Sequence, residues 1–544
     1  MKKNILTTLL LICFGLSSFT QTRYLDDVFS AYTVDANVNY ATNISVMPLA
    51  LGGMPAPEPL YCDIYQPAGD SVTNRPVIIV AHTGSFLPPI LNGQATGSKL
   101  DSSIVEQCRR WAKKGYVAVA MNNRLGWNPT STDQNVRTST LIQAAYRGVQ
   151  DAKAMVRYMR MTAATGNNYG INPNKIVFGG HGTGAYIALG YATLDTLTEI
   201  WTLPKFINFS NPAQPVPYIP PSDPSNPTTT IFGNINGTDT GYCPVLDSNG
   251  APIPGQFWMS NIPNNPSYSN DINMVFNLGG AVPDISWLQS GDVPMVSFHC
   301  ANDPYAPIDT GDVIVPTTGE FVVEVMGSRT VQHYANAYGN NDVFVQAGFS
   351  DVFTTAANNH NSGYEGLYRF ITPPPSTTPN AFGLMEEEQG SPWDWWNNTV
   401  YDSLFMISPT TPPPAAIPGF GAANSILGNP DMSAAKGNAY LDTIQGYLNP
   451  RIYVALNLGS TNIEEVINAS TNIYPNPATD KLHVVSYAVN IDEIIIYNLA
   501  GKKVYSKLIN ANTSSMDINH LNSGVYFIEV KSKNSSVKKK LIVN

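Results

Sequence analysis

The chain has 544 residues, of which 43% are hydrophobic and 13% charged, and its formal net charge is −10. This length allows two or more domains with a sizeable buried core. The charge is acidic and the one basic run, Lys538 to Lys540, is short, so nucleic acid is excluded as an expected partner.

The N-terminus has the pattern of a secretory signal. Two lysines precede an apolar stretch over residues 5–16, and small residues follow it. We therefore assign residues 1–20 to a signal peptide that is removed near Gln21. No other segment approaches about 18 consecutive apolar residues, so we expect no membrane span in the mature chain.

Four cysteines remain after the signal, an even number in an oxidising compartment. This predicts one or two disulfides, with the pairing left open, among Cys62, Cys108, Cys243 and Cys300. Their spacing shows neither a C-x-x-C motif nor a histidine-rich partner cluster, so we expect no metal site. The sequence also lacks a glycine-rich phosphate loop with its lysine, and we expect no cofactor.

Strand and helix patterns alternate from residue 61 to residue 177, which predicts a mostly parallel sheet covered on both faces. Residues 76–81 and 116–121 are short apolar runs typical of buried strands. Residues 103–114 have helical spacing between these runs. A longer helix follows, with apolar residues every three to four positions from Leu141 to Met159.

Residues 175–185 read Lys-Ile-Val-Phe-Gly-Gly-His-Gly-Thr-Gly-Ala, a strand that turns through glycines into a helix. The pattern is that of a G-x-S-x-G elbow, whose outer glycines permit a tight turn that lifts a central serine above the sheet. Gly180 and Gly184 fill the outer positions, and Gly182 fills the central one. The elbow therefore has no hydroxyl to direct at a substrate.

Two long irregular segments follow the elbow, near residues 204–270 and 371–430, both rich in proline. Segments of this length are functional lids or passive insertions. The second contains an aromatic cluster at residues 393–396, which either lines a sugar or polyester surface or packs against the core.

The pattern of alternating elements resumes between and after these segments. Strands are expected at residues 274–278 and 294–298, and a helix at 434–448 closes the domain near Leu456. The first domain thus covers residues 21–460. Residues 463–544 are a series of short alternating strands, which predicts a small antiparallel all-β sandwich.

Four motifs occur in order within this C-terminal part: Ile-Tyr-Pro-Asn-Pro-Ala at 473–478, Ile-Tyr-Asn-Leu-Ala-Gly at 496–501, Leu-Asn-Ser-Gly-Val-Tyr at 521–526 and Lys-Lys-Leu-Ile-Val at 539–543. They resemble the type A sorting domains recognised by the type IX secretion system. The resemblance implies a partner in that machinery, passage through the periplasm, and a final location outside the cell or at its surface. A generic β-sandwich binding module is the alternative.

Six segments of the first domain also carry a resemblance, at residues 82–86, 111–117, 123–126, 144–152, 175–185 and 293–304. From about residue 60 to residue 456 the chain resembles secreted carboxylesterase-like α/β-hydrolases. The resemblance implies a doubly wound, mostly parallel α/β sheet. It also implies a site whose nucleophile, acid and histidine follow one another in the chain.

Candidate residues exist for the acid and the base. Asp303 lies in a turn just past a strand and fits the acid, although an Asx turn before Pro304 would explain it as well. His360, in a polar turn, is the best candidate for the base. His333 has helical neighbours and is expected to be a packed or surface histidine.

The oxyanion donors implied by the resemblance are backbone N–H groups. One is that of Thr183, just after the elbow centre, and the other comes from the loop of Thr83, Gly84 and Ser85. Two of these loop residues replace glycines of the family pattern and are expected to narrow the mouth of the site.

These residues support three hypotheses. In the first, Gly182 leaves an esterase-like protein whose ordinary ester hydrolysis is weak or lost. In the second, a substitute hydroxyl, Thr183 or Ser85, or a water activated by His360, keeps the protein an active ester hydrolase. In the third, the domain binds glycans or polymers at the cell surface. A Gly182→Ser variant that gained activity would show that the other catalytic groups are assembled.

Overall fold

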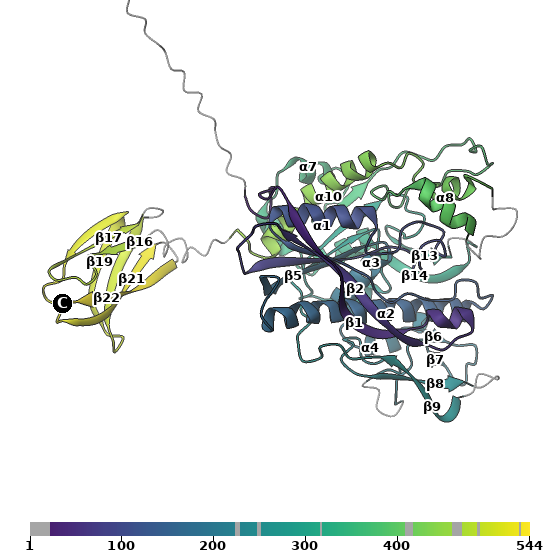
Figure 1. Cartoon of the computed structure of the whole chain (residues 1–544), viewed down its shortest axis with the longest axis horizontal. Coiled ribbons are helices and arrows are strands. Elements are labelled where there is room, and N and C mark those ends of the chain that lie inside the picture. Colours follow the sequence, from purple (N-terminus) through teal and green to yellow (C-terminus); the bar gives the residue numbers. More distant parts are fainter. Residues whose placement is uncertain are drawn as a thin grey trace, which may run out of the picture. The chain divides into compact units, whose positions relative to one another are not determined.

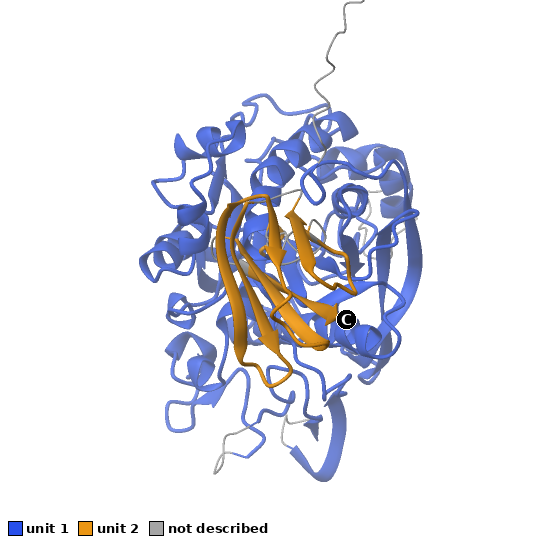
Figure 2. Ribbon diagram, turned by 90° about the vertical axis from the view of Figure 1, so that its left-hand side faces the viewer, with its two compact units in different colours: residues 1–456 blue, residues 457–544 orange. Residues whose placement is uncertain are grey.

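The computed structural model describes residues 22–223, 229–246, 252–315, 318–407, 417–459, 471–486, 490–532 and 535–544. The predicted signal peptide lies outside the described residues. The chain divides into two compact units, unit 1 over residues 1–456 and unit 2 over residues 457–544, which are coloured separately in Figure 2.

Unit 1 is built on one eight-stranded sheet. In spatial order its strands are β1 (Tyr32–Ser45), β2 (Ala56–Pro67), β4 (Val117–Met121), β3 (Arg75–Ala81), β5 (Ile171–His181), β10 (Met274–Leu278), β12 (Met295–Cys300) and β15 (Leu367–Phe370). Every pair from β4 to β15 is parallel, and β1–β2 and β2–β4 are antiparallel. The predicted mostly parallel sheet is confirmed.

Helices cover both faces of this sheet (Figure 1). The helices α2 (Gln134–Ala164) and α3 (Thr183–Thr193) pack on one face, and α1 (Ser102–Lys114) and α10 (Ala434–Ala455) pack on the other. Because both faces are covered, β3, β4, β10 and β12 are buried along their whole length. No helix within the described ranges is both long and apolar enough to cross a bilayer.

Smaller elements surround the main sheet. A second, three-stranded sheet has the order β11 (Ala281–Val282), β14 (Phe321–Gly327) and β13 (Thr310–Ile314). Two short ribbons are formed by β6 (Ile207–Asn208) with β7 (Val216–Pro217), and by β8 (Gly241–Leu246) with β9 (Pro252–Asn261). The remaining α-helices are α4 (Thr198–Trp201), α5 (Ser328–Ala337), α6 (Asp342–Ala347), α7 (Val352–Asn358), α8 (Asn398–Ile407) and α9 (Phe420–Ser425).

The aromatic cluster at residues 393–396 packs against the core at its first member. Trp393 is fully buried, with its ring 6.0 Å from that of Phe370 and 6.2 Å from that of His181. Of the two interpretations that the sequence leaves open, packing therefore holds for Trp393.

The predicted disulfides are wrong, because the structure leaves all four cysteines as free, buried thiols. They lie in separate elements: Cys62 in β2, Cys108 in α1, Cys243 in β8 and Cys300 in β12. Burial raises the pKa of each thiol, that of Cys243 to about 12. The residues behave as small hydrophobic side chains of the core.

Unit 2 consists of two antiparallel sheets that share one core. One sheet contains β16 (Thr471–Tyr474), β17 (Lys481–Ser486) and β20 (Thr513–Asp517), and the other contains β19 (Lys503–Ala511), β18 (Ile491–Asn498), β21 (Gly524–Ser532) and β22 (Ser535–Val543). Buried residues of both sheets, such as Leu482 and Ile528, belong to the same hydrophobic cluster. The predicted all-β sandwich is confirmed.

Candidate functional site

The turn between β5 and α3 has the backbone of a nucleophile elbow. Gly182, at its apex, has φ 49° and ψ −115°, a conformation that favours glycine, and its N–H donates to the Leu278 carbonyl at 2.8 Å. Gly180 lets the helix approach the strand, since a Cβ on it would lie 2.2 Å from the Gly184 carbonyl carbon. The glycines of the elbow thus serve close packing as well as the turn.

The space beside the elbow apex is occupied by Thr83. A Cβ built on Gly182 would lie 2.1 Å from Thr83 Oγ1 and 3.0 Å from Thr83 Cβ. Real Cβ atoms do not come so close to a neighbour, so any side chain at 182 requires Thr83 to move. A hydroxyl from the loop after β3 therefore lies where the side chain of a nucleophile would begin.

The loop that carries Thr83 is held from both ends. His82 is buried, with Nδ1 2.6 Å from the Thr83 carbonyl oxygen, and burial lowers its pKa to about 4, so the ring is neutral near pH 7. The Ser85 carbonyl accepts from Trp127 Nε1 at 2.7 Å, and the Gly84 carbonyl accepts from Asn92 Nδ2 at 3.3 Å. The loop is a fixed wall of the site.

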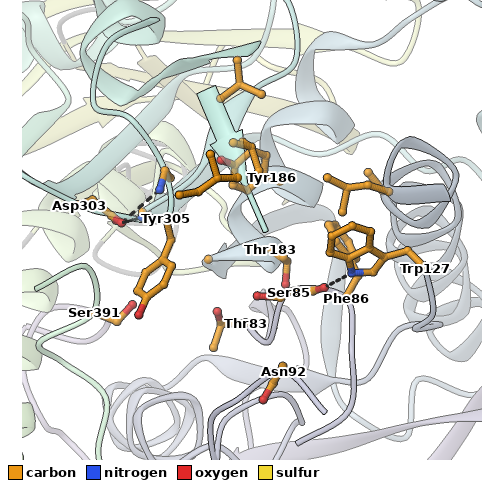
Figure 3. Close-up of a pocket in the computed structure, with 18 of the residues that line it drawn as sticks. Thr83, Ser85, Phe86, Asn92, Trp127, Thr183, Tyr186, Asp303, Tyr305 and Ser391 are labelled. Carbon is orange, nitrogen blue, oxygen red and sulfur yellow. Dashed lines mark hydrogen bonds between the residues drawn. The ribbon is translucent and has the colours of Figure 1, made fainter. Parts of the chain in front are cut away.

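A cavity of about 480 Å³ opens in front of the elbow. Gly182, Thr183, Thr83, Ser85 and Asp303 all line it, whereas Gly84 does not. Figure 3 shows Thr83, Ser85 and Thr183 in the middle of this cavity, with Asp303, Tyr305 and Ser391 on one side and Phe86 and Trp127 on the other. The structure therefore brings together five of the seven predicted site residues.

Asp303 follows β12 and reaches the cavity as a buried carboxylate. Its Oδ1 accepts from the backbone N–H groups of Tyr305 at 2.8 Å and Ala306 at 3.2 Å, which is the Asx turn that the sequence suggested as an alternative. Burial raises the pKa of this carboxyl, and the nearby His299 and the two N–H groups oppose that shift. Asp303 therefore both forms the Asx turn and lines the cavity.

The structure does not bring His360 to Asp303. His360 lies just past the end of α7, is exposed to solvent, and has no place among the described residues that line the cavity. His333 is exposed too, with Nδ1 3.1 Å from the Tyr364 hydroxyl. These are the only histidines of unit 1 that follow Asp303 in the sequence.

The backbone of residue 390 occupies the space next to the Asp303 carboxylate. A Cβ on Gly390 would lie 2.6 Å from Asp303 Oδ1. The imidazole of His299 has Nε2 3.7 Å from Asp303 Oδ2, but this nitrogen bonds to the Ala306 carbonyl and Nδ1 bonds to the Ser328 hydroxyl. Among the described residues, no histidine lines the cavity.

Sequence reasoning missed Asp394, a second buried carboxylate of the cavity wall. Its Oδ1 accepts from the Ser103 hydroxyl and lies 4.0 Å from His181 Nδ1. His181 Nε2 in turn lies 2.6 Å from Gln107 Nε2. The only signal in the sequence was the neighbouring tryptophan cluster, which gave no indication of this network.

The cavity lies in an esterase-like α/β-hydrolase domain, which is followed in the chain by a secretion sorting domain. Residues 62–216 match the BD-FAE family model, and residues 472–544 match the model described as a secretion system C-terminal sorting domain. The sorting domain indicates interaction with the type IX secretion machinery and export to the cell surface or the medium. No group of three potential metal ligands was found in the described parts of the chain.

Solved structures with a similar arrangement include esterases. Esterase 2 of Thermogutta terrifontis with bound propionate is 16% identical, with 65% of this chain and 87% of that chain covered and a TM-score of 0.28. The sarin-phosphonylated form is also 16% identical with the same coverage and a TM-score of 0.29.

One curated relative matches over a short region. The ulvan lyase NLR42 of Nonlabens ulvanivorans is 33% identical over 92 residues. The match covers 16% of this chain and 17% of the lyase, so the chain spans about a sixth of that relative's length.

Proposed function

We propose that unit 1 is an esterase-fold protein that binds a small ligand in its cavity and has weak or no ordinary ester hydrolase activity. The observation that carries this proposal is the place of Thr83 Oγ1, 2.1 Å from where a side chain at 182 would start. Acyl transfer of the serine type needs a hydroxyl, an imidazole and a carboxylate in contact. Among the described residues, the Asp303 carboxylate lines the cavity, but no imidazole does so and position 182 carries no hydroxyl.

The expected size of the defect is large. Removing the nucleophile alone from a serine hydrolase lowers turnover by about 10⁶, and binding and oxyanion groups still leave roughly 10³ over water. Hydrolysis of p-nitrophenyl acetate and butyrate by the purified chain should therefore be about 10⁶ slower than by an ordinary esterase, and at most roughly 10³ faster than in water. Turnover at ordinary esterase rates that is lost in an Asp303→Asn variant would contradict the proposal.

Restoring the chemistry should take more than one substitution. Gly182→Ser alone places its Cβ against Thr83 and leaves Asp303 without an imidazole, so we expect no gain in ester hydrolysis. Adding Thr83→Gly removes the steric conflict, and a histidine in the segment beside Asp303 would also be required. A gain of a hundredfold or more from Gly182→Ser alone would show that a base is already in place.

The competing candidate is an active hydrolase with a substitute hydroxyl. It is favoured by one observation, that the hydroxyl-bearing Thr83, Ser85 and Thr183 all line the cavity. If the chain hydrolyses esters, replacing each of the three by alanine identifies the nucleophile. Activity that survives all three single substitutions excludes these three hydroxyls as the nucleophile.

Binding of a glycan or polymer surface is less well supported. Trp393 is fully buried and offers no ring face to a polymer, while Trp396 lines the cavity. Retention of the chain on insoluble polysaccharide would be needed to revive that hypothesis.

A further inference from the structure

The charges around the cavity are all of one sign. Three carboxylates line it, those of Asp303, Glu387 and Asp394, and no lysine, arginine or histidine does so in the described part of the chain. Glu387 is exposed, and its Oε2 accepts from the Tyr305 hydroxyl at 3.2 Å. Asp303 and Asp394 are deeply buried, with 4% and 5% of their side chains exposed.

In each of the two buried carboxylates, one oxygen accepts no hydrogen bond from the described residues. The donors to Asp303 reach Oδ1, and the donor to Asp394 reaches its Oδ1. The Oδ2 atoms of Asp303 and Asp394 receive no hydrogen bond from the described residues. Both residues line the cavity, so a ligand that donates hydrogen bonds can pair with these oxygens.

The imidazole and ammonium groups near these carboxylates have other partners. His299 lies 3.7 Å from Asp303 and His181 lies 4.0 Å from Asp394, both beyond hydrogen-bond distance. Lys436 contacts the side chains of Gln389, Asn429 and Asp431.

A further carboxyl, that of Asp101, lies near Asp394 but does not line the cavity. Burial raises its pKa well above the usual range, and the nearby Asp394 carboxylate adds to that shift, so Asp101 contributes little negative charge. The charge on this side of the cavity comes from the three lining carboxylates, which no lining cation of the described residues offsets, and it favours a cationic ligand.

The opposite side of the cavity is apolar. Trp127 and Leu141 pack against the valines of β13 and β14, and Figure 3 shows Phe86 and Trp127 away from Asp303. The lining on this side comes from α2, α3 and the small sheet. Such a surface suits an alkyl or aromatic group.

We propose that the cavity binds an amphiphilic amine, with a protonated amino group on the acidic side lined by Asp303, Glu387 and Asp394 and an apolar body against Phe86, Trp127 and Leu141. An ammonium group supplies both the positive charge and the hydrogen-bond donors that the Oδ2 atoms lack. The inference rests on the proposed function in one respect, that the cavity binds small ligands.

The test compares three probes with one apolar body: 4-phenylbutylamine, 4-phenylbutanol and 4-phenylbutyrate. Isothermal titration of the full chain near pH 7.5 should give at least tenfold tighter binding of the amine than of the alcohol, and no binding of the carboxylate. Asp303→Asn and Asp394→Asn should each weaken the amine at least tenfold and leave the alcohol within twofold. Glu386→Gln, which changes a carboxylate outside the cavity lining, is the matched control and should bind all probes like the wild type.

Three results would overturn the inference: equal affinity for amine and alcohol, no binding of any probe, or amine binding that both asparagine variants leave unchanged. Unchanged alcohol binding in the variants shows that they are folded, and circular dichroism checks this independently. The probes contain no ester, so their binding is independent of catalysis. Failure here with no hydrolysis of p-nitrophenyl esters removes only the amine inference, whereas ester turnover removes the proposed function.

Discussion

The elbow and the acid loop lie on different sides of one cavity, and each has a different half of a hydrolase site. The elbow has the backbone of a nucleophile turn, with Gly182 at φ 49° and ψ −115°, but no side chain on it. The acid loop has the side chain, Asp303, but the space next to it is taken by the backbone of Gly390. The elbow thus has the backbone of a nucleophile turn but no nucleophile, and the acid loop has a carboxylate but no imidazole partner.

The difference shows that close packing can explain the geometry of the elbow without a catalytic role. The turn lets α3 pack directly against the sheet, and Gly180 permits that contact. The conformation of Asp303, in contrast, is fixed by an Asx turn and places a carboxylate where burial disfavours its charge. We therefore expect substitutions in the elbow to affect stability most, and substitutions at Asp303 to affect it in a pH-dependent way.

The largest effect is expected for Gly180→Ala. Its Cβ would lie 2.2 Å from the backbone of Gly184, where no side-chain rotation can relieve the clash, so the free energy of unfolding should fall by about 4 kcal/mol or more. Gly428→Ala is the control, since its Cβ would make ordinary contacts at 3.5 Å. Denaturant unfolding measures the free energy of unfolding of both variants. A decrease below about 1 kcal/mol for Gly180→Ala would show that β5 and α3 can move apart at the elbow at little cost.

A smaller effect is expected at the apex and should depend on Thr83. Gly182→Ala combines a left-handed backbone with a contact of 2.1 Å to Thr83 Oγ1, and should lower the free energy of unfolding by about 2–3 kcal/mol. In a Thr83→Ala background the same change should lower it by only about 1 kcal/mol, because the oxygen is gone. Denaturant unfolding of the four proteins gives the coupling energy. If the effects of Gly182→Ala and Thr83→Ala on the free energy of unfolding simply add, the Thr83 side chain moves away from the new Cβ at no cost.

Much of the fold could be predicted from the sequence because its signals are local. The apolar runs at 76–81 and 116–121 indicate strands buried on both faces, and the glycines around 182 indicate the turn. Asp303 is predicted as the acid because it lies in a turn just past a strand, within the segment at 293–304 that resembles the hydrolase family. Each of these predictions rests on residues that are neighbours in the chain.

The rest of the site depends on contacts between distant segments. Thr83 and Gly182 are 99 positions apart, and only the folded loop brings the hydroxyl to the apex. The direction of the polar turn at His360 could not be derived from the number of residues between it and Asp303. Asp394 comes from a proline-rich segment without periodicity. The prediction of disulfides rested on the number of cysteines, and the distances between them are fixed only by the fold.

The smallest expected effect concerns the charge of Asp303. Burial raises the pKa of this carboxyl in the folded state, so between the unfolded and folded pKa values the folded protein binds more protons than the unfolded one. Stability contributed by this group is therefore highest at low pH and falls as pH rises through the folded pKa.

Asp303→Asn keeps an oxygen that can accept from the Tyr305 and Ala306 N–H groups but removes the charge. The variant should be more stable than the wild type near pH 7, and the difference should shrink as the pH is lowered toward 4. Urea unfolding across this pH range tests the sign. A variant that is less stable than the wild type at pH 7 would mean that a partner stabilises the ionised Asp303. The site would then hold this charge favourably, and Asp303 would no longer differ from the elbow in being disfavoured by its surroundings.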